Sequence, residues 1–299
     1  MNSTWNKAKH FLAPSVKILV LVACILFLYF QWKERPLRLE SVLESLKNLP
    51  FHTITLILLL SLASWLVESK KWQLLVRDVE DIRFRESVTQ SLTAQAASFI
   101  TPLRAGEFVF KSLFFKKEQH KEILSRVLIG NLCQMTVTVI LGFIGLSILL
   151  KNDIDGVLFF GFVMFLLGCL GILGLLWIQK KWNISQLAHG VLWKTLGLSL
   201  VRYILFAGNW LLLLSYLKSD LALHFWLDKI AVNYLAVSAV PMFQIADIPV
   251  KWTAASYIFN GSTYQAEFII MATTIIWITN TLFPTLLGCV LLPFKKLKT

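Results

Sequence analysis

The sequence predicts an all-α polytopic membrane protein with about six full spans and two re-entrant helical hairpins, or roughly eight transmembrane helices. Hydrophobic residues make up 57% of the 299 residues, the mean hydropathy is +0.67, and only 15% of the residues are charged. A soluble domain usually carries about a quarter charged residues. This composition therefore excludes an ordinary soluble globule.

Six apolar segments reach or approach the roughly 17–25 residues that a spanning helix needs. They are residues 16–32, 51–67, 127–150, 156–178, 195–217 and 266–292. Three further apolar segments, 87–101, 228–243 and 252–260, are shorter and more polar. We interpret residues 87–117 and 228–260 as two hairpins that enter the membrane from opposite sides.

The positive charges indicate how these segments are oriented. With two hairpins, both termini, residues 68–86, the flanks of the first hairpin and residues 179–194 share one face, which holds most of the 29 lysines and arginines. Cytoplasmic loops are enriched in these residues. We therefore expect a multi-pass protein of a bacterial inner membrane with both termini in the cytoplasm.

In an alternative topology, residues 87–101 cross the membrane completely. The positive charges that follow would then lie outside: Lys111, Lys116, Lys117, Lys121 and Arg126. The excess of positive charge expected on the cytoplasmic side disfavours this alternative.

The two halves of the chain, residues 1–150 and 151–299, show the same order of span, span, hairpin and span. The first half begins inside and the second outside, which predicts an inverted repeat of the kind found in many transporters. Each hairpin contains a proline that interrupts a helix, Pro102 in the first and Pro241 in the second. A chance pairing of short apolar segments is the alternative interpretation.

The first hairpin carries charges at a depth where charge is costly and usually functional. Arg104 and Glu107 are three residues apart, and Lys111 follows one turn later. Irregular backbone within a membrane persists only where protein buries it or where it lines a wet cavity. We therefore predict a substrate-binding site that includes Pro102, Arg104, Gly106, Glu107 and Lys111.

The chemistry of this stretch suits an anion. The planar guanidinium of Arg104 can donate two hydrogen bonds to a phosphate. A helix that restarts at about Ala105 would add N–H groups at its positive end. Gly106 permits a close backbone approach or an unusual dihedral angle. Glu107 would orient Arg104 or meet a cationic group; alternatively, these two residues only neutralise each other and hold the hairpin closed.

The second half offers further candidates. Asp247 and Lys251 place opposite charges in a proline-marked break that would face the first hairpin across a pseudo-twofold axis. Arg202 lies inside the apolar segment 195–217. It either joins the site or extends its side chain to the membrane interface.

Signatures of enzymes and metal sites are missing from the sequence. No Gly-x-Ser-x-Gly elbow, phosphate-binding glycine loop or His-Glu-x-x-His motif occurs, and neither the five histidines nor the four cysteines show metal-ligand spacing. We therefore expect no catalytic residues, metal or cofactor. The net charge of +12 more often sets topology and engages anionic lipid than binds nucleic acid.

Two segments of the chain resemble the membrane region of lysylphosphatidylglycerol synthases, a family that is also described as flippase-like. Residues 68–75 contain a basic-Trp-x-x-Leu-Leu element, and residues 95–107 end in Pro-Leu-Arg-Ala-Gly-Glu, which matches the family pattern Pro-x-Arg-x-Gly-Glu. In multiple peptide resistance factors this region translocates aminoacylated lipid and is joined to a soluble aminoacyl-transferase domain. This chain ends at Thr299 without room for that domain, so the resemblance implies lipid binding or translocation and not lipid synthesis.

The second half departs from the family pattern. A proline followed by Gly-Gly-x-Gly-x-Arg-Glu is expected there, but residues 246–252 read Ala-Asp-Ile-Pro-Val-Lys-Trp. Lys251 takes the place of the arginine, Trp252 takes that of the glutamate, and the glycines are absent.

We therefore expect a flippase-like protein that moves a phospholipid or lipid-linked head group between leaflets. Its partners would be membrane phospholipids with anionic or aminoacylated head groups, together with a lipid-modifying enzyme. The alternatives are a transporter or channel for a small anionic solute, and an accessory subunit of a membrane lipid-modifying transferase.

Overall fold

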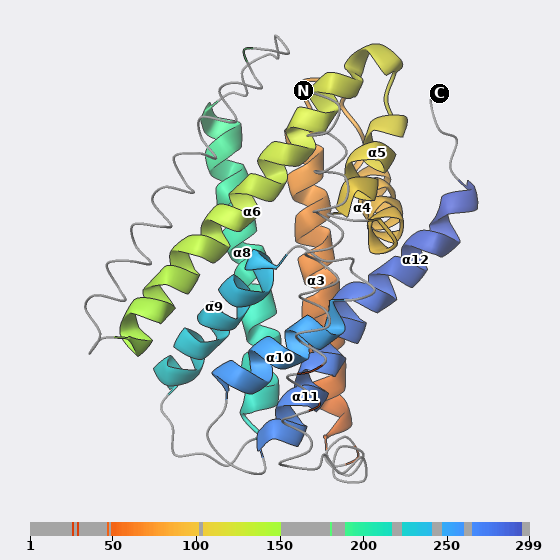
Figure 1. The fold of residues 1–299 in the computed structure, drawn as a ribbon. Coiled ribbons are helices and arrows are strands. Elements are labelled where there is room, and N and C mark those ends of the chain that lie inside the picture. Colours follow the sequence, from red (N-terminus) through yellow and green to blue (C-terminus); the bar gives the residue numbers. More distant parts are fainter. Residues whose placement is uncertain are drawn as a thin grey trace, which may run out of the picture.

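The computed structural model describes residues 49–101, 104–150, 189–216, 223–240, 247–259 and 265–294, with the single positions Leu26, Tyr29, Lys47 and Lys180. Within these ranges all regular structure is helical (Figure 1). The predicted spans 16–32 and 156–178 and the two prolines Pro102 and Pro241 lie outside the described residues. The all-α class is confirmed for the part of the chain that is described.

Four helical segments among the described residues are long and apolar enough to cross a membrane: Phe51–Val76, Lys117–Leu149, Gly190–Leu214 and Ala266–Leu291. They correspond to the predicted spans 51–67, 127–150, 195–217 and 266–292. The total of roughly eight transmembrane helices and the re-entrant geometry of the hairpins stay predictions.

The first half contains α3 (Phe51–Val76), α4 (Phe84–Phe99), α5 (Ala105–Leu113), the short helix η2 (Lys117–Gln119) and α6 (His120–Leu149). The helix α3 continues for more than two turns beyond the apolar segment 51–67. Its polar residues Glu68, Ser69 and Lys71 are buried against neighbouring helices instead of reaching water.

The second half contains α8 (His189–Leu214), α9 (Leu223–Ala239), α10 (Ile248–Ile258), α11 (Gln265–Trp277), the π-helical turn η4 (Ile278–Leu282), α12 (Phe283–Leu291) and η5 (Leu292–Phe294). Pro284 is the second residue after η4 and has no N–H to donate to the carbonyl of Asn280, four residues earlier. That carbonyl instead accepts a hydrogen bond from the indole Nε1 of Trp65, at 3.1 Å. The π turn thereby links the last long helix to α3.

The contacts between helices fall into matched pairs. In the first half α4 packs on α5 and α5 on α6; in the second half α9 packs on α10 and α10 on α11. Between the halves, α3 packs on α8, α6 on α9 and α12 on α4. In Figure 1, α4 and α5 lie toward one end of the bundle and α9 and α10 toward the other.

Glycines allow close contact at two of the three crossings between the halves, that of α12 with α4 and that of α6 with α9. A methyl group at Gly288 of α12 would lie 2.0 Å from the carbonyl oxygen of Leu92 in α4. A methyl group at Gly145 of α6 would lie 2.8 Å from the carbonyl oxygen of Asp228 in α9. In both places helix backbones meet where a side chain would not fit.

Candidate functional site

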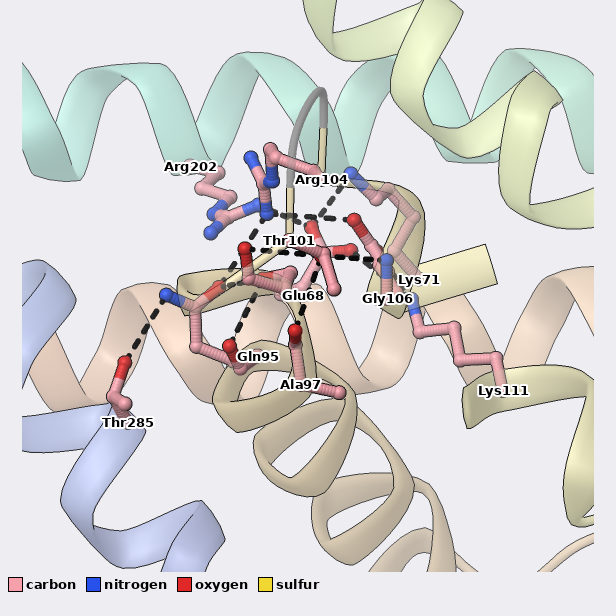
Figure 2. Close-up of polar contacts among 12 residues, drawn as sticks. Glu68, Lys71, Gln95, Ala97, Thr101, Arg104, Gly106, Lys111, Arg202 and Thr285 are labelled. Carbon is pink, nitrogen blue, oxygen red and sulfur yellow. Dashed lines mark hydrogen bonds and ion pairs between the residues drawn. The ribbon is translucent and has the colours of Figure 1, made fainter. Parts of the chain in front are cut away.

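The turn between α4 and α5 is held by Thr101. Its hydroxyl donates a hydrogen bond to the carbonyl of Ala97, at 3.1 Å, and accepts one from the backbone N–H of Gly106, at 2.8 Å (Figure 2). A methyl group at Gly106 would lie 2.3 Å from the carbonyl oxygen of Ala97. Gly106 thus serves the close approach that the sequence suggested, and α5 begins at Ala105 as predicted.

The unusual dihedral angle of this turn falls on Arg104. Its φ of 57° and ψ of 27° are left-handed, and among the described residues it is the one non-glycine residue with positive φ. Such a conformation is costly for a residue with a Cβ atom and tends to occur at functional sites. The turn therefore positions Arg104 in a sterically strained backbone conformation.

The Arg104 side chain is 43% exposed, and its polar contacts with other described residues are long. Its Nη2 lies 3.4 Å from Oε2 of Glu107 and 3.5 Å from Oε1 of Gln95. Gln95 in turn donates from Nε2 to the hydroxyl of Thr285 in α12, at 3.4 Å. Arg104 therefore lies where α4 and α5 approach α12.

Glu107 is buried and contacts Lys111 more closely than Arg104. Lys111 Nζ lies 2.8 Å from Oε1 of Glu107 and 4.0 Å from Oε1 of Glu68 in α3. Glu107 therefore pairs with two cations, of which Lys111 is the nearer and Arg104 the more distant.

Glu68 is the second carboxylate of this cluster. It pairs with Lys71 at 2.7 Å and with the guanidinium of Arg202 in α8. We call the six residues the charge cluster: Glu68, Lys71, Arg104, Glu107, Lys111 and Arg202 (Figure 2). With four basic and two acidic side chains, the cluster has more positive than negative charge.

Aromatic rings surround two of these cations. The guanidinium carbon of Arg202 lies 5.3 Å from the ring centre of Trp65 and 5.2 Å from that of Phe206. Lys111 Nζ lies 4.5 Å from the ring centre of Trp72. Ring faces attract cations, most strongly where water is excluded. Arg202 is only 8% exposed, so its side chain is buried among the helices.

A cavity of about 420 Å³ opens beside the charge cluster and receives residues from both halves of the chain. Arg104 of the first half lines it, together with Arg202, Asp247 and Lys251 of the second. Lys251 Nζ lies 2.9 Å from Oδ2 of Asp247, and Trp277 donates from Nε1 to Oδ1 of Asp247 at 3.0 Å. The structure thus gathers these four predicted site residues around one space.

The other predicted site residues have different places. Three of them are buried near Arg104 and do not line the cavity: Gly106, Glu107 and Lys111. Trp252, at the position where the family pattern has a glutamate, donates from Nε1 to the hydroxyl of Thr274 at 3.0 Å.

Sequence reasoning missed Glu68 and Lys71 as members of the cluster, because their charges suggested a cytoplasmic segment. The signal that would have found them is the family resemblance itself, since residues 68–75 carry one of its two motifs. Trp72 of that motif is also anchored in the interior, where it donates from Nε1 to Oε1 of Gln90 at 2.7 Å.

The chemistry of the lining suits binding of an anion. Among the described residues, three cations and one carboxylate line the cavity, and a guanidinium with exposed N–H groups can bind phosphate or carboxylate. Within the described residues, no group of three or more His, Cys, Asp and Glu side chains is placed to hold a metal ion.

Comparison with known proteins identifies the family of this chain. The sequence profile described as "Lysylphosphatidylglycerol synthase TM region" matches residues 15–184, more than half of the chain. This range includes Glu68, Arg104 and Glu107, whereas α8 to α12 follow it. No curated protein matches the chain. The chain is thus a multi-pass membrane protein that belongs to the family of lysylphosphatidylglycerol synthase membrane regions.

Proposed function

We propose that the protein binds the phosphate-bearing head group of a membrane lipid in this cavity and moves the lipid between the leaflets of a bacterial inner membrane. One observation carries the proposal: Arg104, Arg202 and Lys251 converge on one cavity from both halves of the chain, and among the described residues only Asp247 adds a carboxylate to its lining. An excess of positive charge in a place partly shielded from water attracts an anion strongly. The volume of the cavity falls in the roughly 300–1,000 Å³ range of small-molecule sites.

Arg104 is the proposed phosphate ligand. Its contacts to Glu107 and Gln95 are long, and its buried Nε has no hydrogen-bond partner among the described residues. A phosphate oxygen would satisfy that N–H group and could be bound by two parallel hydrogen bonds. Glu107, held by Lys111, would then orient Arg104.

Movement between leaflets would use the two halves of the chain. The matched contacts between helices and the location of the two short helix pairs toward opposite ends support an inverted repeat. In such proteins one repeat rocks against the other around a central site. The close backbone crossings at Gly145 and Gly288 would be the surfaces on which this motion occurs.

Membership in the family supports a lipid rather than a soluble anion as the ligand. Binding and movement of a head group need no covalent step, so we propose a translocator and not an enzyme. The partners would be the phospholipids, together with an enzyme that modifies their head groups. Both termini would lie in the cytoplasm, as the positive charges indicate.

Reconstitution into proteoliposomes that contain fluorescent phospholipids tests this function. Chemical quenching of the outer leaflet measures how fast labelled lipid moves between leaflets. We expect the wild type to accelerate this movement and Arg104→Gln to slow it by at least tenfold. Arg85→Gln, which removes the same charge from an exposed position of α4, should keep the wild-type rate.

Equal rates in vesicles with and without the wild-type protein would overturn the proposal for those lipids. A parallel assay would follow uptake of inorganic phosphate into the same vesicles. Arg104-dependent uptake of phosphate without movement of lipid would show that the ligand is a soluble anion instead.

A further inference from the structure

We propose that the π turn η4 is a hinge between the helix pairs α4–α5 and α9–α10, and that Trp65 couples this hinge to the cavity. Trp65 is thus a positioning residue, which acts through the Arg202 side chain and through the backbone of Asn280. The inference rests on the proposed function, because it describes how a ligand in the cavity would set the relative positions of the two halves.

The helix before η4 is attached to the second half of the chain. α11 packs on α10, and two indole groups bond them to each other. Trp252 of α10 donates from Nε1 to the hydroxyl of Thr274 in α11, at 3.0 Å. Trp277 of α11 donates from Nε1 to Oδ1 of Asp247, the N-cap residue of α10, also at 3.0 Å. We therefore expect α11 to move together with α10.

The helix after η4 is attached to the first half. α12 packs on α4, where Gly288 lets the two backbones approach closely, and Gln95 of α4 donates from Nε2 to the hydroxyl of Thr285 at 3.4 Å. This crossing would be a fulcrum on which α12 turns without leaving α4. A change in the angle between the two helix pairs would therefore bend the chain between α11 and α12, at η4.

The backbone of η4 is suited to bending. A π turn and a proline are both common causes of a kink in a helix, and Pro284 adds no N–H group to this segment. Side chains bond carbonyl groups in and beside the turn: Asn280 Nδ2 donates to Ile276 at 3.2 Å, and the Thr285 hydroxyl donates to Thr281 at 2.7 Å. Such bonds let an irregular turn persist in a membrane without bare carbonyl groups.

Trp65 of α3 connects this turn to the anion-binding side chains. Its Nε1 donates to the carbonyl of Asn280 at 3.1 Å, and the guanidinium carbon of Arg202 lies 5.3 Å from its ring centre. Both Trp65 and Arg202 line the cavity. An anion that neutralises Arg202 would weaken the attraction between its guanidinium and the ring. Ligand binding would therefore act on the ring whose N–H group bonds the hinge.

An aromatic contact beside the cavity would respond to the bend. The ring centres of Phe99 in α4 and Trp277 in α11 lie 6.3 Å apart, so this contact joins the two parts that η4 connects. Trp277 also lines the cavity. Bending at η4 would change the separation of these rings and with it the access of a ligand to the cavity.

Distances between pairs of spin labels, measured by double electron–electron resonance, test the hinge. The full-length protein would carry serine in place of its four cysteines. Labels at Val109→Cys in α5 and Tyr257→Cys in α10 report the angle between the helix pairs. Labels at Val109→Cys and Leu286→Cys, close to the fulcrum in α12, form the control pair; all three positions are exposed. The protein is measured in a maltoside detergent, which has no phosphate, with and without phosphatidylethanol, an anionic phospholipid whose phosphate carries only an ethyl group.

We expect phosphatidylethanol to shift the distance between positions 109 and 257 and to leave that between positions 109 and 286 unchanged. Pro284→Ala adds an N–H group that can bond a carbonyl of η4. It should reduce the shift and slow lipid movement roughly three- to tenfold, because bending must then break one more hydrogen bond. Pro50→Ala is the matched control, since Pro50 precedes the first turn of α3, and it should keep both properties.

Trp65→Phe tests the coupling, because it keeps an aromatic ring for Arg202 and removes the N–H bond to Asn280. At saturating phosphatidylethanol, the lipid should still bind, but the shift between positions 109 and 257 should be lost. Trp72→Phe is the matched control. Trp72 also contacts a cation with its ring and donates one indole bond, to Gln90, but it does not line the cavity. This variant should keep the shift.

The outcomes separate this inference from the proposed function. If bound phosphatidylethanol leaves the distance between positions 109 and 257 unchanged, or if Pro284→Ala shows the wild-type shift, the hinge is overturned. A wild-type shift in Trp65→Phe would overturn the coupling. If the distances shift but the wild type does not accelerate lipid movement, the proposed function fails while the hinge is supported. Accelerated lipid movement with constant distances would overturn the hinge alone.

Discussion

Arg202 of α8 donates a hydrogen bond to the carboxylate of Glu68 in α3, which joins two candidate spans that are far apart in the sequence. The same carboxylate pairs with Lys71 and lies 4.0 Å from Lys111 of the first hairpin. One buried acid therefore balances three cations, of which Arg202 also lines the cavity. Glu68 therefore links Arg202, which lines the cavity, to Lys111 of α5.

Glu68→Gln should destabilise the protein more than any change at an exposed acid. It would leave Lys71, Lys111 and Arg202 buried with only one acidic side chain, Glu107, nearby. Breaking a buried ion pair costs about 3–5 kcal/mol. Thermal unfolding in detergent measures the effect, with Glu118→Gln as the control because Glu118 is exposed. Equal melting temperatures for the two variants would contradict this role of Glu68.

Gly106→Ala should distort the turn that directs Arg104. The new methyl group would lie 2.3 Å from the carbonyl oxygen of Ala97, and overpacking of this kind costs about 1–3 kcal/mol. Both the melting temperature and the rate of lipid movement should fall. Gly197→Ala is the matched control, since a methyl group there meets no atom within 4 Å. A Gly106→Ala variant with the wild-type melting temperature and the wild-type rate of lipid movement would show that the turn tolerates a Cβ atom.

Arg104→Gly should separate stability from function. Glycine adopts a left-handed φ without the steric cost that a Cβ atom imposes, a difference of about 1 kcal/mol. The variant should therefore unfold at the wild-type temperature or above, while the rate of lipid movement falls as in Arg104→Gln. A lower melting temperature together with normal transport would reverse the assignment and make Arg104 a structural residue.

The pair Asp247 and Lys251 allows a test of charge at the cavity. Lys251→Gln removes a cation and leaves the Asp247 carboxylate without its partner at 2.9 Å, so anionic lipid should bind more weakly. The double variant Asp247→Asn, Lys251→Gln restores the net charge and should recover part of the affinity. Binding of phosphatidylethanol measures both. Equal affinities for the single and double variants would show that net charge at this position does not control binding.

The helices themselves could largely be predicted from local sequence. A long apolar stretch must form its backbone hydrogen bonds within a helix, which is why residues 127–150 and 195–217 correspond well to α6 and α8. The restart of a helix at Ala105 also followed from local chemistry, since a proline interrupts the preceding helix. Nothing in these features required knowledge of a distant neighbour.

The end of α3 and the position of Arg202 could not be predicted in this way. Hydropathy assigns Glu68 and Lys71 to water because an isolated charge is costly in an apolar medium. In the structure, Lys111 and Arg202 come from other helices and supply the opposite charge for Glu68, whose carboxylate in turn pairs with Lys71. The energy of each residue depends on partners that are distant in sequence, so a local pattern does not contain it.

The sequence by itself thus determined the membrane class, the helices of its apolar segments and the family, and it selected Arg104 and Glu107 as candidate site residues. Each of these depends on short-range chemistry or on a motif of contiguous residues. The tertiary structure decided that Arg104, Arg202 and Lys251 share one cavity and that Glu68 supports the site from α3. Packing of α3 against α8 and of α6 against α9 brings these residues together. Only that packing provides the partners that make so many buried charges stable.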